Sequence, residues 1–150
     1  MSGNFYGRQT AGNVKAKNKL YKGIETPLDL YDALSGLWCA DTCAPRMRHE
    51  WSEENKTLGQ CSITAFLAQD IFGGEVYAMP TDNGGVHCYN VVEGYVFDLT
   101  SEQFGEGAKT LCYEGNEIQD RESAGHFGKE EKRRRYEYLK ELLKQLLNLY

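Results

Sequence analysis

Three short strand-like runs follow one another so closely that they restrict the fold more than any other feature of the chain. The runs cover residues 75–79, 86–92 and 95–99, and each is bounded by turn-forming residues. The gaps between them are too short to hold a helical crossover, so neighbouring strands must pair antiparallel. The sequence therefore predicts an antiparallel sheet in the second half of the chain.

Three helices are expected to surround this sheet. The segment 61–72 is apolar over most of its circumference and stops at a pair of glycines, which predicts a helix buried on most sides. An earlier helix is expected to begin at Pro27, because a capping threonine precedes the proline. A long helix over about 129–149 has an apolar stripe at steps of three and four residues. Residues 105–128 are Gly-rich and acidic, and we expect them to form a loop.

The composition is that of one ordinary globular domain. The chain has 150 residues and a net charge of −5, and a single domain usually takes about 100–200 residues. The sequence contains neither the ~18 consecutive apolar residues of a membrane span nor the apolar core of a secretory signal, so we expect a cytoplasmic protein with no membrane partner. Its five cysteines form an odd set, which favours reduced thiols over a disulfide framework.

Charge is distributed unevenly along the chain. Residues 1–22 carry five basic side chains and no acidic one, and we expect them to form a flexible basic arm ahead of a single domain at residues 23–150. An arm that contacts nucleic acid is the alternative, but too few basic residues cluster there. Residues 51–127 carry three basic and thirteen acidic side chains. A cleft in that block should favour neutral or cationic substrates and disfavour nucleic acid.

Cys61 stands where a reactive thiol would be placed. It is expected to begin a helix directly after a glycine-containing loop. At a helix N-terminus, the dipole and the free N–H groups lower the pKa of a thiol, and the thiolate is the nucleophilic form. The backbone N–H of Cys61 could also stabilise an oxyanion. The position therefore predicts a nucleophilic cysteine.

The predicted hairpin brings a histidine and a carboxylate together. A two-residue turn at positions 93–94 places His87 and Asp98 on one face as diagonal neighbours, with Cβ atoms ~7–8 Å apart. From there the carboxylate can hold the imidazole in one tautomer. We expect Cys61 to pack across this face and Cys88 to point away from it. The set then contains a nucleophile, a base and a group that orients the base.

Two other interpretations stay open from the residues alone. Cys61 and His87 could be packing residues of a non-catalytic binding module that holds a peptide or a partner protein in an acidic cleft. Alternatively, the pair Cys39 and Cys43, with His49 nearby, could bind zinc if a fourth ligand folded in. Structural zinc sites usually use two such pairs, and this chain has one, so the zinc interpretation is disfavoured.

Two stretches, GQCSITAFLAQDIFGGEVY and HCYNVVEGYVFDLTSEQF, resemble the YunG-like family of small bacterial proteins. They are also similar to a compact form of the papain-like and transglutaminase-like cysteine enzyme superfamily. In that superfamily the cysteine begins a helix, the histidine lies on a strand and the aspartate lies on the next strand. The resemblance implies that Cys61 is the nucleophile, His87 the general base and acid, and Asp98 the residue that orients His87.

The resemblance implies an α+β fold of papain-like or transglutaminase-like type, with the nucleophile-bearing helix packed on an antiparallel sheet and further helices at both ends. The implied activity is that of a cysteine hydrolase or acyltransferase acting on an amide or thioester through an acyl-enzyme, with no metal or organic cofactor. The substrate, whether a small molecule, a peptide or a protein, stays unidentified, and both a monomer and a homodimer are compatible. Papain-type enzymes place an oxyanion-binding Gln several residues before the cysteine, whereas here Gln60 is adjacent and is the candidate donor.

Overall fold

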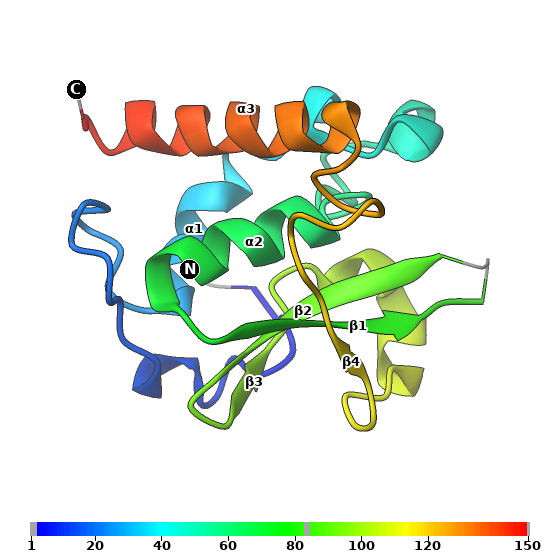
Figure 1. Cartoon of the computed structure of the whole chain (residues 1–150), viewed down its shortest axis with the longest axis horizontal. Helices are drawn as coiled ribbons and strands as arrows, with labels where there is room; N and C mark the ends of the chain where they lie inside the picture. Colours follow the sequence, from blue (N-terminus) through cyan, green and yellow to red (C-terminus); the bar gives the residue numbers. More distant parts are fainter. Residues whose placement is uncertain (1–2, 83–84, 150) are drawn as a thin grey trace.

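A computed structural model describes residues 3–82 and 85–149 of the chain. It is an α+β structure in which helix α2 lies between a sheet and helix α3 (Figure 1). The elements are, in order, η1 (Ala11–Asn13), α1 (Pro27–Ser35), η2 (Ala40–Thr42), η3 (Pro45–Glu50), α2 (Cys61–Phe72), β1 (Glu75–Pro80), β2 (Val86–Val92), β3 (Tyr95–Phe97), η4 (Ser101–Thr110), β4 (Glu117–Ile118) and α3 (Glu130–Leu146). The expected antiparallel sheet with flanking helices is confirmed. Among the described residues, no helix has both the length and the apolar character needed to cross a bilayer.

The strands pair antiparallel in the order β3-β2-β1-β4. Glu93 and Gly94 form the turn between β2 and β3 with φ values of 51° and 85°, as a two-residue type I′ turn requires. Asn90 therefore lies opposite Phe97, which is the predicted register. The two-residue strand β4 was not predicted. It lies within the expected loop, and a pair of residues is too short to show an alternating pattern.

Helix α2 is buried on most sides, as its composition predicts, with nine of its twelve residues buried. It packs on the sheet face that carries Cys88, Asn90 and Phe97, and the Asn90 amide donates to the carbonyl of Ala65 at 2.9 Å. This is the face opposite His87, so the expected packing of the helix on the His87 face is wrong. The helix covers the face that buries the larger apolar area, since the His87 face carries histidine, aspartate and tyrosine side chains.

Residues 3–22 pack on the domain and do not form the expected flexible arm, whose first two positions lie outside the described residues. Phe5 is 2% exposed and its ring stacks on Tyr31 with centroids 5.1 Å apart. Val14 and Tyr21 are also buried in the core. The amide of Asp98 donates to the carbonyl of Tyr6 at 2.9 Å, so this segment forms an isolated β-bridge just after β3. The apolar residues are too irregularly spaced to show a period, which is why the sequence pattern missed them.

Substitution of Phe5 tests whether this packing contributes to stability. Phe5→Ala is expected to lower the free energy of unfolding by about 3–5 kcal/mol, the usual cost of removing a buried aromatic ring. Leu20 in the same segment is 73% exposed, so Leu20→Ala should change the free energy of unfolding by less than about 0.5 kcal/mol. Urea unfolding measures both values, provided that the slope of the unfolding free energy against urea concentration is the same in each variant. Equal midpoints for the two variants would show that the segment does not pack.

Candidate active site

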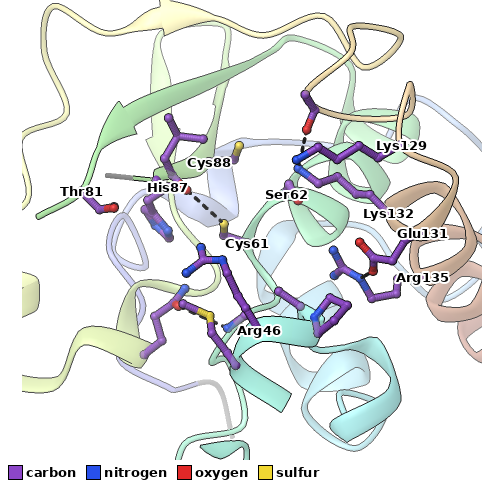
Figure 2. Close-up of a pocket in the computed structure, with 18 of the residues that line it drawn as sticks. Arg46, Cys61, Ser62, Thr81, His87, Cys88, Lys129, Glu131, Lys132 and Arg135 are labelled. Carbon is purple, nitrogen blue, oxygen red and sulfur yellow. Dashed lines mark hydrogen bonds and ion pairs between the residues drawn. The ribbon is translucent and has the colours of Figure 1, made fainter. Parts of the chain in front are cut away.

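A cavity of about 730 Å³ opens at the N-terminus of α2. Cys61 lines it as the first residue of the helix, with its Sγ atom 4.0 Å from the carbonyl oxygen of Val86 (Figure 2). The first N–H groups of an α-helix have no acceptor within the helix, and they form its positive end. The thiol is therefore partly exposed to the cavity at a position that favours its ionised form.

Cys61 reaches the neighbourhood of His87 where β2 begins. Strand β3 pairs with β2 only from Asn90 to Val92, so β3 does not cover the start of β2. The first turn of α2 meets β2 there, at Val86 and Cys88. The helix can thus lie on one face of the sheet while its terminal thiol lies beside an imidazole from the other face.

His87 and Asp98 form a buried pair, in the neighbouring positions that the hairpin register predicts. His87 Nε2 lies 2.6 Å from Asp98 Oδ2, and each side chain is 1% exposed. The Tyr113 hydroxyl donates to the same carboxylate oxygen at 2.7 Å, and the Thr100 amide donates to Asp98 Oδ1 at 3.3 Å. A carboxylate held by these donors fixes the orientation of the ring. Within the described chain, the buried Nδ1 atom of His87 has no hydrogen-bond partner, so this nitrogen is available for a proton from Cys61.

Charge and hydrogen bonding at these groups favour a thiolate–imidazolium pair. The pKa of Cys61 is well below its usual value, because the Cys88 thiol donates a hydrogen bond to it and the adjacent His87 is cationic, and these effects exceed the opposing effect of burial. Burial alone would lower the pKa of His87. The Asp98 carboxylate and the Cys61 thiolate outweigh that effect and raise it to about 10.

Cys88 is a part of the site that the sequence analysis missed. Its side chain does point away from the face of His87, as expected, but α2 covers that other face and brings Cys61 next to it. Donation to the Cys61 thiolate and burial both raise the pKa of Cys88, so Cys88 stays protonated and acts as the donor. Only the choice of face by α2 reveals this role, and no local pattern in the sequence indicates it.

The structure does not bring Gln60 into the site. Its side chain is fully buried, and its amide donates to the carbonyl of Cys39 at 3.1 Å. Gln60 is also absent from the lining of the cavity. The backbone N–H groups of Cys61 and Ser62 are the donors that the geometry offers, since both residues line the cavity at the start of α2.

The charges that line the cavity contradict the expected acidic cleft. Glu131 is the single acidic side chain among the described lining residues, whereas four are basic: Arg46, Lys129, Lys132 and Arg135 (Figure 2). These basic residues come from η3 and from the start of α3, outside the acidic block at residues 51–127. Counting charge within one stretch of sequence therefore assigned the wrong sign to the cavity.

The residues named in the disfavoured zinc interpretation are not arranged as a metal site. Within residues 3–82 and 85–149, no group of three or more His, Cys, Asp or Glu side chains is placed to hold a metal ion. Cys43 is fully buried, while the His49 side chain is 75% exposed beside Glu50. The five cysteines are all free, as the odd number predicts.

Comparison with known proteins gives the family. The family described as "YunG protein" matches residues 26–148. The chain belongs to the YunG family. The resemblance seen in the sequence is therefore confirmed at the level of the family. A curated member, "Uncharacterized protein YunG" of Bacillus subtilis (strain 168), is 46% identical over 55 residues, which cover 37% of this chain and 47% of that protein. The match thus spans about half the length of this relative. No solved structure matches the chain significantly.

Alkylation with iodoacetamide measures the ionisation of Cys61. The rate at Cys61 should rise with pH at a midpoint below ~8.5, the value of a free thiol. His87→Ala and Cys88→Ala should each raise the midpoint, because each removes a group that stabilises the thiolate. Cys88→Ser keeps a donor and should raise it less. Peptide mass spectrometry resolves the individual cysteines.

Cys112 is exposed and lies outside the lining of this cavity, so Cys112→Ala is the matched control and should leave the midpoint of Cys61 unchanged. A Cys61 thiol that stays unreactive until the protein is denatured would show that it is a packing residue.

The buried His87–Asp98 pair makes stability depend on pH in a defined direction. The pKa of His87 is about 10 in the folded protein and about 6.5 in an unfolded chain. Its protonation therefore stabilises the fold fully below about pH 6.5, and this contribution is lost as the pH rises to about 10. The excess stability of the native protein over Asp98→Asn, measured by urea unfolding, should be largest near pH 6 and shrink towards pH 10. A difference that grows with pH would contradict the pairing.

Proposed function

We propose that this member of the YunG family is a cysteine-dependent hydrolase or acyltransferase that acts on an amide or thioester. One observation carries the proposal: a thiol with a lowered pKa lines an open cavity next to a histidine whose other ring nitrogen is held by a buried carboxylate. This combination supplies a nucleophile, a proton carrier and a group that orients the carrier.

The proposed reaction begins with attack of the Cys61 thiolate on the acyl carbonyl carbon. A carbon–sulfur bond forms, and the carbonyl electrons move to the oxygen, where the N–H groups at the start of α2 stabilise the oxyanion. As the oxyanion collapses, the bond to the leaving amine or thiol breaks. The leaving group takes the proton that His87 carries on Nδ1, and the acyl-enzyme remains.

In the second half of the reaction, His87 accepts a proton from an incoming water or amine. The activated nucleophile then adds to the thioester carbonyl, and Cys61 leaves as the thiolate. Water as acceptor makes the protein a hydrolase, and an amine makes it an acyltransferase. Asp98 keeps its charge throughout and holds the ring for both proton transfers.

A papain-like or transglutaminase-like relationship is part of this proposal. It is supported by the chain order, in which Cys61 begins a helix, His87 lies on a strand and Asp98 directly follows the next strand. It is also supported by the packing of that helix on an antiparallel sheet. These features explain how the three groups meet in a short chain.

Reaction with an activated ester tests the proposal directly. The native protein should release p-nitrophenol from p-nitrophenyl acetate in a burst followed by turnover, and it should gain one acetyl group on Cys61. Cys61→Ala should abolish the burst, and His87→Ala should slow acylation by about 10²–10⁴-fold, the usual contribution of a general base or acid. Cys112→Ala is the control that should react like the native protein. Adding hydroxylamine as an amine acceptor distinguishes acyl transfer to an amine from hydrolysis by water.

Equal release of p-nitrophenol by the native protein and by Cys61→Ala would contradict a thiol nucleophile. It would favour the alternative in which the same fold serves as a non-catalytic binding module for a peptide or a partner protein.

A further inference from the structure

We infer that the acyl substrate carries an anionic group, a carboxylate or a phosphate, that is bound by Arg46, Lys129 and Lys132 beside the bond that Cys61 attacks. The inference rests on the proposed function and adds the class of substrate to it. Arg46 belongs to η3, and the two lysines lie at the start of α3. Figure 2 shows all three side chains reaching into the cavity around Cys61.

Two of these cations have no partner in the part of the chain that the structure describes. The side chains of Arg46 and Lys129 make no hydrogen bond or ion pair there, and both residues are exposed. Glu131 does not neutralise them, because its carboxylate is bound by the guanidinium of Arg135. Arg135 is itself buried and also donates to the carbonyl of Thr42 at 3.1 Å, so this ion pair belongs to the framework of the domain.

Lys132 is built into the wall of the cavity. Its ammonium donates to the carbonyl of Gly125 at 2.8 Å and lies 3.2 Å from Nδ1 of His126. Burial of this ammonium lowers the pKa of Lys132, while the negative charge of the Cys61 thiolate opposes the shift. An ammonium has three donors, so one remains for a ligand. The structure therefore holds a cation near the nucleophile and leaves one of its hydrogen-bond donors free for a ligand.

His126 explains how the wall tolerates this lysine. It is 3% exposed, and its Nε2 atom lies 2.9 Å from Oε1 of Gln119. Burial and the nearby charge of Lys132 lower the pKa of His126 to about 4, so the ring is neutral at physiological pH. In that state Nε2 donates to Gln119, and Nδ1 accepts from Lys132. A neutral buried acceptor positions the ammonium while leaving its charge available to an anion.

The placement of these charges fits an anionic substrate better than a solvated surface. Cations from two separate elements line one cavity together with the nucleophile, and the one acidic side chain among the described lining residues is already paired. Such a site raises the local concentration of anions and fixes their orientation towards the thiol. An acyl compound with a charged group close to the scissile bond would be held with its carbonyl at Cys61.

Two alkylating agents of nearly equal size and the same leaving group provide the test. Iodoacetate is anionic and iodoacetamide is neutral, and their rate constants are measured at Cys61 and Cys112 of the same sample, at a pH above both midpoints. We expect the rate constant for iodoacetate, divided by that for iodoacetamide, to be at least about tenfold higher at Cys61 than at Cys112. Added salt should reduce this difference between the two cysteines.

Charge-matched variants separate the local effect from net charge. Arg46→Gln/Lys129→Gln should reduce the ratio at Cys61 towards that at Cys112. Lys19→Gln/Arg133→Gln removes the same charge from exposed residues outside the cavity and should keep the ratio of the native protein. Protection of Cys61 by succinate would assign a carboxylate, and protection by inorganic phosphate would assign a phosphate. Protection by neither would contradict the anion site.

Failure of this inference is distinguishable from failure of the proposed function. If iodoacetamide reacts at Cys61 with a low pH midpoint but iodoacetate has no advantage, the anion site is wrong and the nucleophile stands. If neither reagent reaches Cys61 in the folded protein, the anion site and the proposed activity both fail.

Discussion

The packing of helix α2 on strand β2 is the contact on which the site depends. The Asn90 amide is buried in this interface and finds its acceptor at the carbonyl of Ala65. A buried amide that loses its partner carries a desolvation penalty of about 1–3 kcal/mol, so sliding the helix by one turn of about 5.4 Å is disfavoured. The hydrogen bond therefore sets the axial position of α2, and with it the place where Cys61 meets the start of β2.

A second constraint holds the ionisable pair in place from the opposite face. Asp98 receives hydrogen bonds from Tyr113 and Thr100, and its backbone amide is bound by Tyr6 of the first segment. The ring of Tyr113 stacks on that of Tyr6 with centroids 3.9 Å apart. These contacts surround a charge that would be costly to bury alone. Segments far apart in the chain thus cooperate to keep His87 in one orientation beside the thiol.

Local regularities in the sequence predict much of this arrangement. The apolar pattern of residues 61–72 and the glycines behind it predict a buried helix that begins at Cys61, and the helix has these bounds. Glu93-Gly94 forms a two-residue hairpin turn with positive φ at both positions, and a turn of this type allows few backbone conformations. The register of that hairpin then places His87 and Asp98 on one face. Periodicity and turn chemistry are properties of neighbouring residues, so the sequence shows them directly.

By itself, then, the sequence determined the central helix, the hairpin register and the meeting of His87 with Asp98. Only the tertiary structure decided which sheet face α2 covers, and hence that Cys88 lies beside Cys61. It also turned Gln60 towards Cys39 and brought Arg46 and the lysines of α3 to a cavity that the acidic central block had suggested would be negative. The physical reason is the same in each case: these contacts join segments separated by tens of residues, and their geometry follows from how apolar faces are buried together.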